Sequence, residues 1–254
     1  MSVLDVIILS IVEGLTEFLP ISSTGHMIAA AGFMKIDQTA ATSAFEVIIQ
    51  LGAILAVAVD YKDKLTMKYL PLWIKIIAGF LPVAVVGLIF HEQVKAMFSV
   101  RVVGIMLIIG GVVFIIAEFL YRRVHIRVRT LDAIGLKAAL FAGFAQVLAL
   151  VPGTSRAGVV ILGAMFAGAD RKTGTELSFL MALPVMVAAS GFDLINNYQT
   201  LRVIGLGKLG LGFLIAFITA YASIRVLIRF VKNNSLIGFG IYRILFGALI
   251  LLCF

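Results

Sequence analysis

The sequence predicts an all-α polytopic membrane protein, and its composition and long apolar segments are the main reasons. Of its 254 residues, 62% are hydrophobic and 13% are charged, whereas soluble domains are about half apolar and about a quarter charged. A helix needs about 20 apolar residues to cross a bilayer, and no segment alternates as the strands of an outer-membrane barrel do. Six segments are predicted to span: 44–60, 70–90, 101–120, 176–195, 205–228 and 236–254.

Two further apolar regions, 3–34 and 133–168, are interrupted in the middle. The first contains Pro20 followed by a Ser-Ser-Thr-Gly run, and the second contains Pro152 followed by Gly153. Proline and glycine break helices, and backbone groups freed at membrane depth must be buried in protein or line a wet cavity. Each region is therefore predicted to be a re-entrant hairpin of two half-helices.

The basic residues predict how the chain crosses the membrane. The formal charge of +8 comes largely from short loops rich in Lys and Arg, at 61–68, 121–130, 169–175 and 229–235. Such loops are typical of the cytoplasmic side. If these loops lie in the cytoplasm, the order of the spans is consistent only when the two hairpins enter the membrane from opposite sides and both termini lie outside. No basic stripe with interleaved aromatic residues is present, so we expect no nucleic-acid partner.

The two hairpins also resemble each other, which predicts an inverted repeat within a single membrane domain, 1–254. A shift of 132 residues lays Pro20 on Pro152 and Ser23 on Ser155. The pseudo-repeats are expected at about 1–120 and 121–254. In inverted repeats with broken helices, the site lies near the middle of the membrane.

Glu13 and Glu17 are the first candidate site residues. They lie four positions apart and so share one helix face. Two carboxylates in apolar surroundings must be protonated, paired or bound to a cation. Oxygen ligands suit Mg²⁺ or Ca²⁺, so we expect a divalent cation. The structural alternative is a carboxylate pair bonded to hydroxyl groups across the bundle.

The turn after Pro20 offers hydroxyl groups and an imidazole from Ser22, Ser23, Thr24 and His26. A half-helix that begins near Ser22 would point its amides and its positive dipole end at a ligand, which favours an anion such as phosphate. Capping is the alternative role for the serines. It does not explain the histidine one turn later.

Arg156 is the strongest single signal of the second hairpin, where it follows Gly153 and Ser155. A guanidinium at membrane depth needs an anionic partner, and its planar fork suits phosphate oxygens. A structural ion pair with Glu13 or Glu17 is the alternative.

Glu46 and Gln50 repeat the four-residue spacing on the next span. They are expected to support the site from behind or, equally, to serve helix packing. Asp193 and Arg243 are candidates for an ion pair between spans.

The motifs resemble those of a known family. EGLTEFLPISSTGH at 13–26 and PGTSRAG at 152–158 resemble the two motifs of the bacterial undecaprenyl-diphosphate phosphatases, the bacitracin-resistance protein family. The resemblance covers essentially the whole chain. One departure lies in the second motif, where the family usually has two more hydroxyl groups and this chain has Ala157 and Val160.

The resemblance implies hydrolysis of undecaprenyl diphosphate to the monophosphate and inorganic phosphate, which recycles the lipid carrier of peptidoglycan. It implies a multi-pass protein of the bacterial inner membrane, a divalent cation, a site open to the periplasm and a homodimer. Arg156 would bind the diphosphate, Glu13 and Glu17 would hold the cation, and the hydroxyl groups of Ser22, Thr24 and Ser155 would donate to phosphate oxygens.

The residues leave two questions open. The nucleophile is Ser23 with His26 as its base, His26 itself, or water. The rival function is a transporter or lipid flippase, because broken helices in inverted repeats are common in secondary transporters. A transporter needs binding groups but no nucleophile, so the density of hydroxyl, imidazole and carboxylate groups favours the phosphatase.

Overall fold

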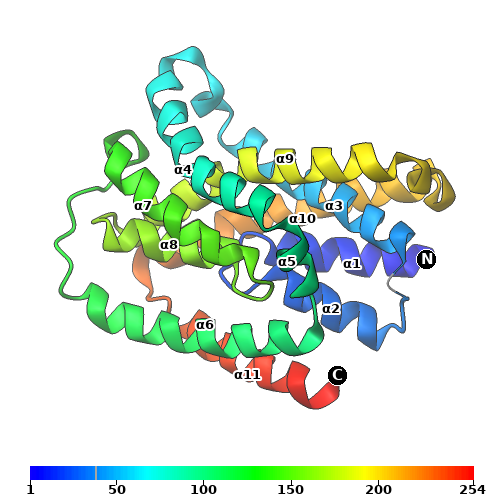
Figure 1. Ribbon diagram of the computed structural model, residues 1–254. Coiled ribbons are helices and arrows are strands. Elements are labelled where there is room, and N and C mark those ends of the chain that lie inside the picture. Colours follow the sequence, from blue (N-terminus) through cyan, green and yellow to red (C-terminus); the bar gives the residue numbers. More distant parts are fainter. Residues whose placement is uncertain (38) are drawn as a thin grey trace.

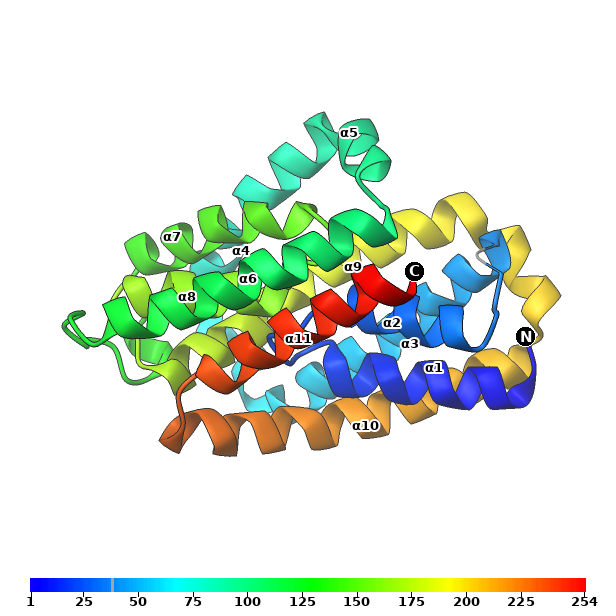
Figure 2. The same cartoon turned by 90° about the horizontal axis from the view of Figure 1, so that it is seen from below.

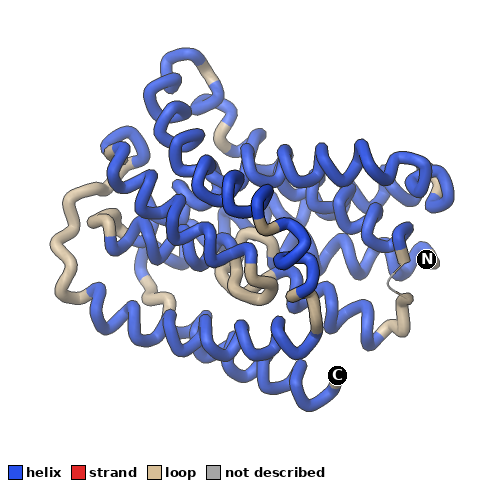
Figure 3. Tube along the Cα trace, in the orientation of Figure 1, coloured by secondary structure: helices blue, strands red, loops and turns tan. Residues whose placement is uncertain are grey.

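The protein is described by a computed structural model covering residues 1–37 and 39–254, with the side chains of 193, 194 and 196–203 left aside. This described part is helical and contains no strand (Figure 3), which confirms the all-α prediction. The helices are α1 (Val3–Thr16), α2 (Ser23–Phe33), α3 (Ala40–Asp60), α4 (Leu70–Ile89), α5 (His91–Ala96), α6 (Val100–Tyr121), α7 (Leu136–Val147), α8 (Arg156–Phe166), α9 (Arg171–Ile204), α10 (Leu206–Asn233) and α11 (Ile237–Cys253).

Five of the six predicted spans have the length and composition of membrane-crossing helices: α3, α4, α6, α9 and α10. The sixth, α11, has 17 residues, which lies at the lower limit for crossing a bilayer. The chain is therefore a multi-pass membrane protein.

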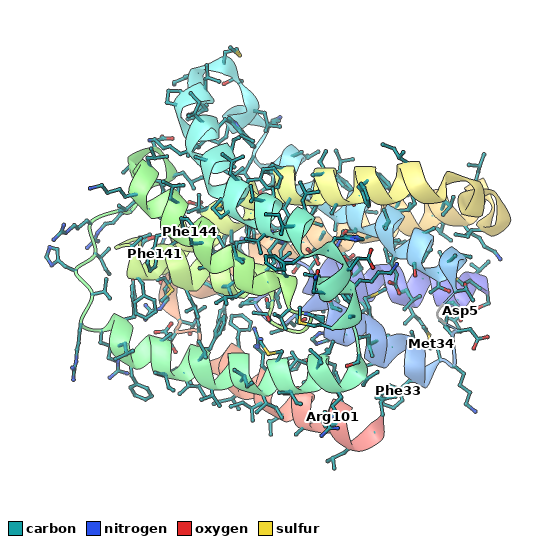
Figure 4. The ribbon with its side chains drawn as sticks, in the orientation of Figure 1. Asp5, Phe33, Met34, Arg101, Phe141 and Phe144 are labelled. Atoms are coloured by element: carbon teal, nitrogen blue, oxygen red, sulfur yellow. The ribbon has the colours of Figure 1, made fainter. Side chains whose placement is uncertain are left out.

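The two interrupted regions form the hairpins α1–α2 and α7–α8, as predicted. In Figure 1, both termini lie at one end of the bundle; α1 runs from there to the middle and α2 returns. The pair α7–α8 approaches the middle from the opposite end (Figure 2). The labelled side chains of Figure 4 follow this division, because Asp5, Phe33 and Arg101 lie toward the termini and Phe141 toward the other end.

The structural repeat differs from the predicted shift by one residue. The helices of the two hairpins begin at Val3 and Leu136 and at Ser23 and Arg156, so corresponding residues are 133 positions apart. The same shift relates Lys35 and Gly168, which both have positive φ after the returning half-helix. The predicted shift is 132 because it aligns Pro20 with Pro152. The backbone instead aligns Ser22 with Ser155, which both have positive φ.

The packing follows the inverted arrangement. Helix α1 packs on α10 as α7 packs on α4, while α6 runs along α11. Glycines permit the last contact: a Cβ on Gly240 would lie 2.8 Å from the carbonyl oxygen of Gly111, and one on Gly247 would lie 2.7 Å from that of Gly104. Small residues that let backbones approach are typical of membrane helix pairs.

The charge-rich loops gather at the end opposite the termini. Lys64 forms an ion pair with Asp132 at 3.0 Å, and the backbone of Val128 bridges to Ala169. At the other end, the Nζ of Lys208 donates to the carbonyl oxygen of Met1 at 2.7 Å. The loops therefore divide between two ends in the way the predicted topology requires.

The break expected between the predicted spans 176–195 and 205–228 lies only at its C-terminal end. Residues 196–204 continue α9, which runs for 34 residues. The sequence has neither proline nor glycine between 192 and 204, so nothing in it breaks the helix. Gly205, with φ of +88°, ends α9 and leads directly into α10. Between the predicted spans 70–90 and 101–120, the chain forms the short helix α5.

Candidate active site

The two turns between the half-helices meet in the middle of the bundle. The first turn covers residues 17–22 and the second covers 151–155. Each ends in a serine with positive φ, +71° at Ser22 and +73° at Ser155. Such values are uncommon outside glycine and cost about 1–3 kcal/mol, a strain that clusters at functional sites. Both strained serines directly precede a helix start, so α2 and α8 begin beside the meeting point.

Arg243 of α11 holds the two turns together. Its side chain is fully buried, and it donates to the carbonyl oxygens of Pro20 at 3.3 Å, Gly153 at 3.0 Å and Thr154 at 2.9 Å. It also donates to the carbonyl oxygen of Met106 at 3.3 Å. One guanidinium therefore bonds both turns and α6.

The role expected of Arg243, an ion pair with Asp193, does not appear in these contacts, and the Asp193 side chain lies outside the described residues. Our sequence reasoning missed the carbonyl contacts, although a buried cation in an apolar helix was a signal. Glycines make room for the arrangement: a Cβ at Gly110 would overlap the Arg243 guanidinium, and one at Gly153 would lie 2.6 Å from the carbonyl oxygen of Val103.

Three predicted residues form a linked group across the two hairpins. The hydroxyl of Ser23 donates to Oε2 of Glu17 at 2.5 Å. The guanidinium of Arg156 donates to Oε1 of the same carboxylate at 2.9 Å and to the carbonyl oxygen of Ser178 at 3.2 Å. Glu17 and Arg156 are largely buried, with side chains 7% and 13% exposed, so this ion pair is shielded from solvent.

Glu13 adds a second buried carboxylate to the group. It is 5% exposed, and it lies within electrostatic range of Glu17, Glu46 and Arg156. The group thus contains three carboxyl groups and one guanidinium, so carboxyl groups are in excess over cationic side chains. Within the part of the chain that the structure describes, no group of three or more His, Cys, Asp or Glu has the geometry of a metal cluster.

This donor set still fits the predicted cation. Mg²⁺ is usually bound through one or two carboxylates together with substrate phosphates and water, and a divalent charge would offset the excess. Glu13 would be the main ligand, because both oxygens of Glu17 already accept hydrogen bonds from Ser23 and Arg156.

A cavity of about 180 Å³, the inner cavity, lies between the turns. Most of the predicted site residues line it, from both hairpins and from α3: Glu17, Ser22, Ser23, Thr24, Gln50, Gly153, Ser155 and Arg156. The structure thus brings together the hydroxyl, carboxylate and guanidinium groups that the sequence singled out.

A larger cavity of about 750 Å³, the outer cavity, adjoins it and shares Ser23, Thr24 and Gln50 with it. Glu13 and Glu46 line its polar part. Much of its wall is apolar and comes from α2, α3 and the segment at the start of α6: Met27, Ile28, Val47, Phe98 and Val100. It reaches Ile36, which follows α2, and Ser43, which lies in the first turn of α3, on the side of the termini.

His26 lies apart from this group. It lines neither cavity, and its two ring nitrogens contact the carbonyl oxygen of Ser22 at 2.7 Å and the hydroxyl of Tyr242 at 2.6 Å. Its ring stacks on Phe246 with a centroid distance of 4.2 Å. A carbonyl oxygen only accepts, so Nδ1 carries a proton and donates to Ser22. The structure therefore does not join His26 to Ser23 as a base.

The remaining predicted residues have local partners. The hydroxyl of Ser155 accepts from the backbone N–H of Gly158 at 3.2 Å and so caps α8, a role that we had considered only for Ser22 and Ser23. Ser22 makes no such cap bond. Gln50 accepts from the Ser190 hydroxyl at 3.4 Å.

Comparison with known proteins supplies the family. The sequence profile of the bacitracin resistance protein BacA matches residues 6–249. The chain belongs to this family. An undecaprenyl-diphosphatase of Sulfurovum is 48% identical over 252 residues, which are 99% of both chains. Undecaprenyl-diphosphatase 2 of Pseudoalteromonas translucida is 49% identical over 99% of this chain and 98% of its own. An undecaprenyl-diphosphatase of Methanococcus aeolicus is 44% identical over 100% and 99%.

The departure from the bacitracin resistance protein motif falls in the core rather than in the site. Ala157 and Val160 are 1% and 0% exposed, and neither lines the inner or the outer cavity. Val160 belongs to the main hydrophobic core. The missing hydroxyl groups therefore leave the lining of the two cavities unchanged.

Proposed function

We propose that this protein is a membrane phosphatase that hydrolyses undecaprenyl diphosphate to undecaprenyl phosphate and inorganic phosphate. The observation that carries the proposal is the Ser23 hydroxyl, which donates to the Glu17 carboxylate beside Arg156 at the wall of the inner cavity. A nucleophile bonded to a base that a third group orients is the arrangement of covalent catalysis. Family membership agrees with it.

The first step is attack by the Ser23 oxygen on the terminal phosphorus. The proton passes to Oε2 of Glu17, the bond between that phosphorus and the bridging oxygen breaks, and Glu17 gives the proton to the undecaprenyl phosphate that leaves. Water then attacks the phosphoserine and gives a proton to Glu17; the bond between phosphorus and the Ser23 oxygen breaks, Glu17 returns the proton to that oxygen, and inorganic phosphate is released with Ser23 restored. Of the three nucleophiles left open by the sequence, the geometry favours Ser23 with Glu17, rather than His26, as its base.

Arg156 and the start of α2 bind the phosphate. The guanidinium stabilises negative charge on the transferred group, and positioning and electrostatics supply most of the rate in such reactions. The amides at the start of α2 have no side-chain cap from Ser22, so they are available to phosphate oxygens. Glu13, with help from Glu17, would hold a bound Mg²⁺ or Ca²⁺, which would neutralise negative charge on the phosphate.

The lipid tail fits the outer cavity. Its apolar wall leads from Glu13 and Ser23 toward the termini, so a polyprenyl chain would lie there with its diphosphate at the inner cavity. In our proposal the product rejoins the carrier pool for peptidoglycan synthesis, which is the origin of the bacitracin resistance.

Phosphate release by the purified protein in detergent tests the function, because transport is impossible there. We expect release from undecaprenyl diphosphate that Ser23→Ala removes and that the distant control Ser235→Ala retains. A folded protein that binds the lipid and releases no phosphate would instead be a transporter or flippase.

Chelation tests the cation. Excess chelator should abolish release, and added Mg²⁺ or Ca²⁺ should restore it, because the site holds three carboxyl groups and only one guanidinium. Full activity in chelator would leave Glu13 as a proton carrier or a structural group.

The site is proposed to open to the periplasm of the bacterial inner membrane. The native Cys253, exposed and at the end with both termini (Figure 1), tests this without mutation. A membrane-impermeant thiol reagent should label it in spheroplasts; labelling only after lysis would reverse the orientation. The homodimer expected from the resemblance is tested by light scattering in detergent.

A further inference from the structure

A second cavity of interest lies at the opposite end of the bundle from the termini. It has a volume of about 530 Å³ and sits where α3 ends, α9 begins and α10 ends. Its charged lining comprises Asp60, Lys172, Glu176, Arg225, Arg229 and Lys232. It shares no residue with the inner or the outer cavity, so it is separate from the phosphatase site.

The charges of this basic groove do not balance. Asp60 accepts from Arg225 at 3.1 Å, and Glu176 lies 3.6 Å from Lys172. Each carboxylate is therefore occupied by one cation. Arg229 and Lys232 are exposed and have no ion-pair partner among the described residues. The groove is left with two cations that suit an anionic ligand.

The groove also lies at the end of an apolar stripe. On α10, Leu214 and Ile218 are 53% and 55% exposed. Arg225 and Arg229 follow Ile218 by about two and three helical turns and so continue the same helix face. Exposed apolar side chains on a membrane-crossing helix face lipid tails. A molecule with tails along this stripe would place its head at Arg229 and Lys232.

We propose that this groove binds the phosphate group of an anionic phospholipid, whose tails lie along α10. Lys and Arg at a membrane surface attract anionic lipids, and guanidinium groups match phosphate oxygens. The apolar stripe favours a lipid over a soluble phosphate compound, because only a lipid uses both features.

The test is native mass spectrometry of the full chain in detergent, titrated with phosphatidylglycerol. The variant is Arg229→Gln with Lys232→Gln, and the matched control is Arg123→Gln with Arg129→Gln. The control removes the same charge from exposed residues in the neighbouring 121–130 loop. We expect the groove variant to bind phosphatidylglycerol about tenfold more weakly and the control to bind within twofold of the wild type. Phosphate release in detergent should be unchanged in both.

Three outcomes would overturn the proposal. Equal weakening in both variants would mean attraction to general surface charge. Equal binding of phosphatidylcholine and phosphatidylglycerol by the wild type would mean that the groove does not select an anion. Displacement of the lipid by inorganic phosphate at the same concentration would mean a soluble ligand.

Discussion

The two hairpins have similar backbones at their turns but carry side chains of opposite charge. Ser22 and Ser155 share the same unusual φ, and the helices that follow, α2 and α8, both have 11 residues. The residues at corresponding positions, 133 apart, differ. Ser23 of the first hairpin corresponds to Arg156 of the second, and Glu13 corresponds to Gln146. The first hairpin supplies the nucleophile and the acids, and the second supplies the cation.

This difference teaches how one site can arise from a repeated fold. The backbone places two helix starts beside each other in the middle of the bundle, and the side chains differ according to which half they come from. The Glu17–Arg156 ion pair is the point where the two halves join. Arg243, which bonds carbonyl oxygens of both turns, fixes their relative position.

Replacing one serine in each hairpin by alanine should give the largest difference between the two hairpins. We expect Ser23→Ala to lower the rate of phosphate release by at least about a thousandfold, because it removes the nucleophile. Ser155→Ala should lower the rate far less, since its hydroxyl caps α8 at the N–H of Gly158, and loss of a cap costs about 1 kcal/mol of stability. Rates measured beside melting temperatures check this. Equal losses of rate would contradict the assignment of different roles.

Arg156→Lys tests the guanidinium group that the second hairpin contributes. It keeps the charge but loses the planar fork, so we expect the rate to fall about a hundredfold, with the melting temperature near that of the wild type. The measurement is the rate beside thermal unfolding in detergent.

Arg156→Ala distinguishes chemistry from architecture. Breaking a buried ion pair costs about 3–5 kcal/mol, so this variant should also unfold early. Adding Glu17→Gln should restore stability without restoring the rate. Recovery of the rate in the double variant would show that the pair is purely structural.

Arg243→Lys should weaken the junction of the two turns. An ammonium group cannot reach all the carbonyl oxygens that the guanidinium bonds, and each hydrogen bond to a charged group contributes about 1.5–3 kcal/mol. We expect a lower melting temperature and a roughly tenfold lower rate, with Arg101→Lys of the same bundle as the control. A variant with normal stability and normal rate would refute the bonding role.

Much of this could be predicted from the sequence. Hydropathy located the spans, and Pro20 and Pro152 located the turns, because both signals act locally along the chain. Glu17, Ser23 and Arg156 were also found, since charged and hydroxyl groups at membrane depth are costly without a function or a partner.

The rest depended on geometry that a sequence does not encode visibly. Ser22 and Ser155 correspond in the structural repeat because both have positive φ. Nothing in the sequence around a serine shows that its φ is positive. His26 was predicted to be the base or the nucleophile. In the structure its ring contacts Tyr242 on α11, 216 positions away, and such a distant contact gives no local signal in the sequence. The carbonyl contacts of Arg243 were not predicted, because backbone carbonyl oxygens exist at every position and give no signal.

The most direct test of the account is to trap the phosphorylated enzyme. Substrate labelled in its terminal phosphate is mixed with the protein, quenched within the first turnover and mapped by mass spectrometry, under acid and under alkaline conditions. We expect acid-stable phosphate on Ser23, and we expect the same result when His26 is replaced by Phe. Acid-labile phosphate on His26, or full turnover with no phosphorylated residue, would contradict it.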